Sequence, residues 1–221
     1  MTEPDTPTPL FPIRRMISKY FLPPNQGAER ELVDTILKRR AGQDVSIYQT
    51  RYFKLRTAQA DWKSPGFARL PDGLDLFPPY WFMPWKGKER KPIGFYGKFL
   101  RRVRFNGLYM KFEQLLDGIL QDGYRSDCPP IKGDCLVHPD HGEIFIYTDG
   151  NQRMGILSYL AEQKGGYDFE VPVKIESRTH RDDILRHPTA EEGLKKGYFS
   201  KADVLRWFDH PFDAMATDEP I

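Results

Sequence analysis

The sequence predicts an α+β fold, and the order of its hydrophobic patterns is the reason. An apolar stripe at helical spacing is followed by two short apolar runs around a Pro–Gly turn, which is typical of a β-hairpin. A second helical stripe and an alternating strand pattern come next. We therefore expect a helix, a β-hairpin, a helix and a strand over residues 100–180, with helical N- and C-terminal extensions.

The first helix of this unit is expected over residues 107–123, where apolar residues recur on one side at helical spacing. Gly123 is a natural C-terminal stop, because glycine readily adopts the left-handed conformation that ends many helices. The residues expected on the buried stripe are Leu108, Phe112, Leu115, Leu116, Ile119 and Leu120.

The hairpin is expected to have strands near residues 134–138 and 143–148, joined by a turn at 139–142. A helix should follow over 151–163, and then a strand over 168–177 with alternating Val and Ile. The residues expected on the inward side of that helix are Met154, Leu157, Leu160 and Ala161.

The N-terminal part of the chain is expected to be less regular. Four prolines lie within the first twelve residues, so residues 1–25 are predicted to form a disordered or extended tail. Residues 26–99 are predicted to be an N-terminal extension, with a helix over 28–42 and an extended segment over 45–58.

A long irregular connection is expected over residues 61–97, which are rich in proline, glycine and aromatic side chains. Its large aromatic residues should pack on the domain, because large aromatic side chains are mostly buried in hydrophobic cores. They are Trp81, Phe82 and Trp85. Residues 181–221 are predicted to form a C-terminal helical extension, in which Ser200 and Asp203 have the spacing of a capping box.

Composition excludes several classes of protein. The chain has 221 residues, 39% of them hydrophobic, and a mean hydropathy of -0.61. No apolar run approaches the roughly 20 residues that cross a bilayer, so no membrane contact is expected. Two cysteines do not make a disulfide framework, and no signal-peptide pattern opens the chain. The expected location is cytoplasmic.

The most informative stretch is the corner where the second hairpin strand meets the following helix, DGNQR at residues 149–153. The first N–H groups of a helix lack intrahelical partners and favour an anion. Gly150 permits a tight turn, and Arg153 adds a planar guanidinium group whose N–H donors suit phosphate. Asp149 beside a bound phosphate would hold Mg²⁺ or take a proton from an attacking hydroxyl. The alternative is an ordinary Asp–Gly turn with an exposed arginine.

This motif resembles the D-G-x-H-R signature of the ParB/sulfiredoxin-like superfamily, and the order of elements over residues 105–177 also fits that family. The resemblance implies a bacterial protein that binds the phosphate of a nucleotide at the start of this helix. It implies cofactor-binding positions at Gly150, Asn151, Gln152 and Arg153. Asp149 is expected to be the catalytic carboxylate, which acts as the base, and also the metal ligand. Asp134 and Glu113 are the alternatives for the base.

Two departures from the family pattern narrow the function. Gln152 stands where the family has histidine, and glutamine cannot shuttle protons near pH 7. Asn151 stands where sulfiredoxins carry cysteine, so sulfinic-acid repair is not expected. The resemblance then implies either a kinase that transfers phosphate from ATP or ADP, with Mg²⁺, to a small hydroxyl compound, or a small ParB-like protein of unsettled role.

A different class of function competes with nucleotide binding. Residues 86–104 carry eight Lys or Arg and one Glu, so a non-catalytic interaction or nucleic-acid-binding protein could use this basic segment. Cys128, Cys135, His138 and His141 lie close in sequence, but their spacing is not a familiar zinc pattern. His180 and Arg181 follow the last strand of the unit and would either reach over the corner or begin an ordinary helix.

Overall fold

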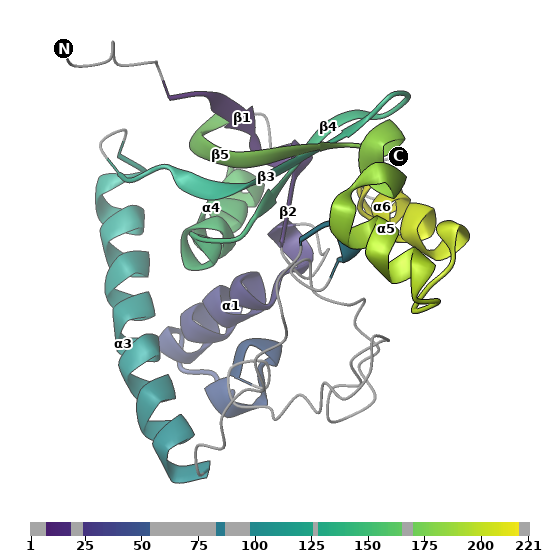
Figure 1. Cartoon of the computed structure of the whole chain (residues 1–221). Helices are drawn as coiled ribbons and strands as arrows, with labels where there is room; N and C mark the ends of the chain where they lie inside the picture. Colours follow the sequence, from purple (N-terminus) through teal and green to yellow (C-terminus); the bar gives the residue numbers. More distant parts are fainter. Residues whose placement is uncertain are drawn as a thin grey trace, which may run out of the picture.

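The computed structural model describes residues 8–18, 24–53, 83–86, 98–125, 128–164 and 170–216, and the α+β class is confirmed (Figure 1). In this part of the chain the strands form one five-stranded sheet in the order β1-β5-β3-β4-β2. The strands are β1 (Leu10–Pro12), β2 (Met16–Ser18), β3 (Ile131–His138), β4 (Gly142–Tyr147) and β5 (Glu170–His180). The α-helices are α1 (Ala28–Arg40), α3 (Lys98–Asp122), α4 (Asn151–Gln163), α5 (Pro188–Lys195) and α6 (Lys201–Ala216).

The predicted hairpin, helix and strand form the centre of the sheet. β3 and β4 pair in antiparallel fashion, with Cys135 opposite Phe145. After α4 the chain returns as β5, which is parallel to β3. The return across one face of the sheet places the start of α4 at the end of β4, beside the start of β3.

The N-terminal segment was expected to be disordered or extended, and its described part contains two extended strands. β1 pairs with β5 in antiparallel fashion, and β2 pairs with β4 in parallel fashion, so both are edge strands of the sheet. Between them Ile13–Arg15 form one 3₁₀ turn. The edges accept these short strands because their apolar residues Phe11, Met16 and Ile17 become buried there.

The two faces of the sheet are covered by different helices (Figure 1). α4 packs on one face, where Cys135, Phe145 and Met154 share a core cluster. α6 packs on the other face, where Leu136 and Phe208 share a second cluster. Since side chains alternate along a strand, successive residues of β3 serve opposite faces. α1 and α3 then pack behind α4 in a third cluster.

Helix α3 was expected to begin near residue 107, and it begins nine residues earlier at Lys98. Phe112, Leu116 and Ile119 are buried as expected, but Leu108 and Leu120 are 37% and 38% exposed. α3 lies at the outer side of the helical layer (Figure 1). The predicted stripe was therefore too wide, because hydrophobic spacing gives a face but not the width of the contact.

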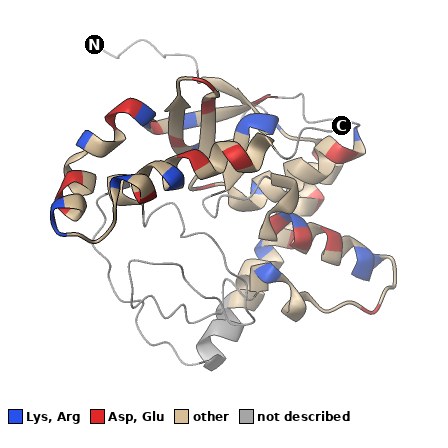
Figure 2. Ribbon diagram, turned by 90° about the vertical axis from the view of Figure 1, so that its right-hand side faces the viewer, with Lys and Arg blue, Asp and Glu red and all other residues tan. Residues whose placement is uncertain are grey.

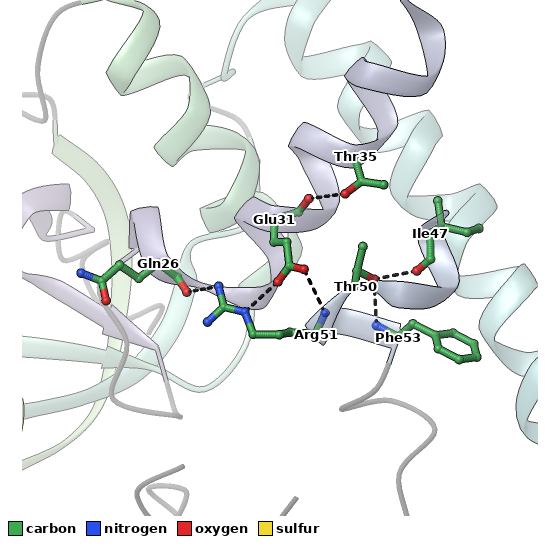
Figure 3. Close-up of polar contacts among 7 residues, drawn as sticks. All are labelled: Gln26, Glu31, Thr35, Ile47, Thr50, Arg51 and Phe53. Atoms are coloured by element: carbon green, nitrogen blue, oxygen red, sulfur yellow. Dashed lines mark hydrogen bonds and ion pairs between the residues drawn. The ribbon is translucent and has the colours of Figure 1, made fainter. Parts of the chain in front are cut away.

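The segment predicted to be extended over 45–58 is wrong in its described part, residues 45–53. Ile47–Gln49 form a 3₁₀ turn, and residues 51–53 are helical. Side chains that bond to nearby backbone explain the difference (Figure 3). Thr50 Oγ1 donates to the Ile47 carbonyl at 2.7 Å and accepts from the Phe53 N–H at 3.2 Å.

The C-terminal extension is helical in its described part, residues 181–216. Arg181–Arg186 form a 3₁₀ helix, and α5 and α6 follow. The capping box is confirmed: Asp203 N–H donates to Ser200 Oγ at 3.1 Å, and Ser200 N–H donates to Asp203 Oδ2 at 3.0 Å. Most of the long connection over 61–97 lies outside the described residues, including Trp81 and Phe82. Trp85 is buried against Phe208, as expected for a packing residue.

Acidic and basic residues are mixed along the described helices in the view of Figure 2. This mixture agrees with the small net charge of +2. None of the helices within the described residues has both the length and the apolar character needed to cross a bilayer.

Candidate functional site

The corner at residues 149–153 is a sharp turn between β4 and α4. The N–H groups of Thr148 and Asp149 both donate to the Lys132 carbonyl, at 2.9 and 3.2 Å, so the chain ends β4 still held to β3. Gly150 then takes a left-handed conformation with φ of 76°. The first helical bond runs from Met154 N–H to the Gly150 carbonyl at 2.9 Å. α4 therefore starts immediately after the C-terminal end of β4.

Gly150 is required here for two separate reasons. Its positive φ is strained for any residue with a side chain. A Cβ at this position would also lie 3.2 Å from Arg153 Nη2 and 3.2 Å from Ile131 Cγ1. The glycine therefore allows the Arg153 guanidinium to fold back over the start of its own helix.

The N-terminus of α4 carries partial positive charge. The N-cap residue is Gly150, which has no side chain that could accept a hydrogen bond from the first N–H groups of the helix. The N–H groups of Asn151, Gln152 and Arg153 precede the first possible intrahelical acceptor, so the helix itself does not satisfy them. Together with the helix dipole they favour an anion at this end.

Asp149 is exposed at the same corner. Its Oδ1 accepts a hydrogen bond from the Gly150 N–H at 2.7 Å. This bond fixes the carboxylate beside the turn and leaves its second oxygen facing away from that N–H. Asp149 is thus placed where a group bound at the start of α4 would meet a carboxylate.

Arg153 is half-buried, and its side chain is positioned by the segment that leads into β3. Arg153 Nη1 donates to the Pro129 carbonyl. The guanidinium also lies beside the hydroxyl of Tyr124, towards which only its N–H groups can donate. Burial raises the pKa of Tyr124, and the positive charge of Arg153 partly opposes that rise. An arginine has five N–H donors, and Pro129 takes one of them.

Asn151 and Gln152 bond to different segments. Asn151 is only 7% exposed, and its Nδ2 donates to the Thr148 carbonyl at 3.4 Å, while its Oδ1 is buried without a hydrogen-bond partner among the described residues. Gln152 Nε2 donates to the hydroxyl of Tyr52 at 3.0 Å. The Gln152 side chain is thus directed to the N-terminal extension.

The residue before Tyr52 is held by hydrogen bonds at the first turn of α1 (Figure 3). That residue, Arg51, bonds through its Nε to Glu31 Oε2 at 2.7 Å and through its backbone N–H to Glu31 Oε1 at 3.2 Å. Arg51 Nη2 also donates to the Gln26 carbonyl at 2.9 Å. Sequence reasoning missed Tyr52 and Tyr124, and no local pattern marks either of them, because their partners lie far away along the chain.

The other acids considered as a base do not reach the corner. Asp134 is 2% exposed, accepts a bond from Ser177 Oγ and has the same strand parity as Leu136, so it faces the α6 side of the sheet. Glu113 lies on α3 and accepts from the Tyr109 hydroxyl at 2.9 Å. Of the three acids, Asp149 alone is at the start of α4.

The cysteine and histidine cluster does not assemble into a metal site. Cys135 is fully buried in the core, where burial raises the pKa of its thiol to about 12. His138 Nδ1 accepts from the Asp140 N–H at 3.1 Å, and its ring lies 4.5 Å from that of His141. Across the described residues no three His, Cys, Asp or Glu side chains converge in a way that would hold a metal ion.

Arg181 does not lie over the corner. Its guanidinium makes two bonds to Asp209 on α6, at 2.7 and 2.8 Å, and these tie the end of β5 to the C-terminal helix. His180 is exposed at the same end of β5. The basic segment predicted over residues 86–104 lies outside the described side chains.

No family model matches this chain, and no curated protein or solved structure is significantly similar to it.

Proposed function

We propose that this protein binds a nucleotide or another phosphate ester at the corner Asp149–Arg153, as a member of the ParB/sulfiredoxin-like type. The observation that carries the proposal is the Arg153 guanidinium folded over Gly150 at the uncapped start of α4. A phosphate bound there would accept from the first N–H groups of the helix and from the guanidinium. The order of helix, hairpin, helix and strand supports the same reading.

The proposal extends to phosphoryl transfer onto a small hydroxyl compound. The acceptor oxygen would form a bond to the terminal phosphorus, the bond from that phosphorus to the bridging oxygen would break, and a nucleotide with one phosphate fewer would leave. Asp149 would take the proton of the hydroxyl, because Gln152 has no titratable group and is bonded to Tyr52.

Mg²⁺ would bind at this corner together with the nucleotide, because Asp149 alone supplies too few ligands to hold the ion without phosphate oxygens and water. Magnesium bound to nucleotides usually uses one or two carboxylates together with phosphate oxygens and water. Asp149 supplies one such carboxylate at the exposed corner. When bound, the ion would neutralise charge on the phosphates.

Isothermal titration tests the binding. ATP, ADP and CTP, each with Mg²⁺, would be titrated into the wild-type chain, Arg153→Ala and Arg153→Lys. Lys164→Ala is the matched control, because it removes one positive charge from the opposite, exposed end of the same helix. We expect saturable binding that Arg153→Ala loses and Lys164→Ala keeps. If none of the three nucleotides binds, the proposal of a nucleotide site is contradicted.

Phosphoryl transfer needs its own assay. The wild-type chain and Asp149→Asn would be incubated with the nucleotide that binds and with a panel of small amino-acid and sugar hydroxyl compounds. We expect a phosphorylated product with the wild-type chain and at least a hundredfold slower formation with Asp149→Asn. Equal rates would remove Asp149 from the chemistry, and absence of product with every compound would leave a binding protein.

A further inference from the structure

We infer that the Tyr124 hydroxyl is an additional ligand-binding donor of this site, beside Arg153. The inference rests on the proposed function and deepens it, because it adds a residue from outside the 149–153 motif. Two observations carry the inference: the position of Tyr124, and a second unpaired polar atom at the same helix start.

The end of α3 fixes the position of Tyr124. Gly123 takes a left-handed conformation with φ of 78°, and its N–H donates to the Ile119 carbonyl at 3.0 Å, which ends the helix. The next residue, Tyr124, packs against both the α4-side core of the sheet and the α1–α3 core. Its ring therefore sits between two clusters, and its hydroxyl reaches the Arg153 side chain.

The hydroxyl of Tyr124 is buried, and its O–H finds no acceptor among the described residues, since Arg153 beside it can only donate. Buried polar groups are nearly always paired, because an unpaired one loses its bonds to water without replacement. A phenylalanine would fill the same space without this cost. A tyrosine here is explained if a ligand oxygen accepts its O–H when the site is filled.

Asn151 gives an independent observation at the same helix turn. Its Oδ1 is also buried and unpaired, although its residue is more than nine-tenths buried. This atom can only accept a hydrogen bond. The first turn of α4 thus combines donors from the helix start, Arg153 and Tyr124 with one acceptor, Asn151 Oδ1, that lacks a partner among the described residues. This combination suits a phosphate ester that also carries a hydroxyl group.

Tyr124 acts as a donor at neutral pH. Burial raises the pKa of its phenol, and the opposing effect of Arg153 does not reverse the rise. The phenol therefore stays protonated and can donate to a phosphate oxygen that Arg153 contacts at the same time.

The test is Tyr124→Phe, compared with Tyr109→Phe. Tyr109 is the matched control: it lies on α3, the helix that Tyr124 follows, but its hydroxyl is paired with Glu113 at 2.9 Å. Affinity for ATP and for inorganic phosphate would be measured by titration, and the thermal stability of each free protein by calorimetry. We expect Tyr124→Phe to weaken binding roughly tenfold or more without lowering the melting temperature. We expect Tyr109→Phe to lower the melting temperature and leave binding unchanged.

The outcomes separate this inference from the proposed function. If Arg153→Ala loses binding and Tyr124→Phe keeps full affinity, the role of Tyr124 is overturned while the phosphate site stands. A fall in melting temperature in Tyr124→Phe equal to that of Tyr109→Phe would mean that its hydroxyl is paired within the protein, which also overturns the inference. If the wild-type chain binds neither probe, the proposed function fails, and the role of Tyr124 fails with it.

Discussion

The side-chain amide of Gln152 donates to the hydroxyl of Tyr52 at 3.0 Å, across 100 positions of the chain. Tyr52 is buried beside Phe105 and Phe112. The bond therefore joins the first turn of α4 to the helical layer formed by α1, α3 and residues 46–53. The Gln152 side chain thus anchors the corner to the N-terminal extension.

This link predicts a measurable coupling between the two residues. Tyr52→Phe removes the hydroxyl and keeps the ring, so it should lower the free energy of unfolding by about 1 kcal/mol. A double-mutant cycle with Gln152→Ala should give a coupling energy of about 0.5–1.5 kcal/mol in urea unfolding. Strict additivity of the two single changes would mean that the bond does not contribute to stability.

Gly150→Ala should damage both stability and binding. The positive φ alone should cost about 1 kcal/mol, and the contacts at 3.2 Å with Arg153 and Ile131 should add about 1–2 kcal/mol. Gly197→Ala is the control, because Gly197 has a similar φ of 67° and open space around it. Thermal unfolding should show a larger loss at Gly150. Equal losses would mean that the guanidinium and Ile131 move aside freely.

The two cysteines should differ strongly in reactivity. Cys135 is fully buried, and its thiol has a pKa of about 12, so almost no thiolate forms at pH 8. Cys128 is partly exposed. Titration of the native protein with a thiol reagent at pH 8 should modify one cysteine rapidly, and mass spectrometry should place the label on Cys128. Rapid labelling of Cys135 without denaturant would contradict its burial.

The capping box of α6 should make part of the stability depend on pH. Hydrogen bonds from the backbone N–H and hydroxyl of Ser200 lower the pKa of Asp203. A carboxyl with a lowered pKa in the folded state stabilises the fold above its unfolded pKa, about 3.9, and loses that contribution as the pH falls. The difference in melting temperature between wild type and Asp203→Asn should therefore be largest above about pH 5 and shrink towards pH 2. In a Ser200→Ala background this pH dependence should become smaller but persist, because the hydroxyl bond is lost while the bond from the backbone N–H of residue 200 remains.

Local patterns in the sequence were sufficient to predict the secondary structure in the middle of the fold. The hairpin, the helix over 151–163 and the strand after it were predicted within a few residues, because alternation and helical spacing report directly on which side of an element is buried. The capping box of α6 was also readable, since its two partners are three residues apart. The cluster of Asp149, Gly150 and Arg153 belongs to the same class of local signal.

The tertiary structure decided how that cluster is surrounded. The partners of Gln152, Arg153 and the edge strands come from segments far away in sequence: Tyr52, Pro129 with Tyr124, and residues 10–18. Edge strands of three residues carry too short a pattern to be recognised. Long-range pairing depends on which surfaces remain to be buried once the central elements have packed. The sequence by itself therefore determined the turn and its charges, and the packing of distant segments determined which of its polar atoms are paired.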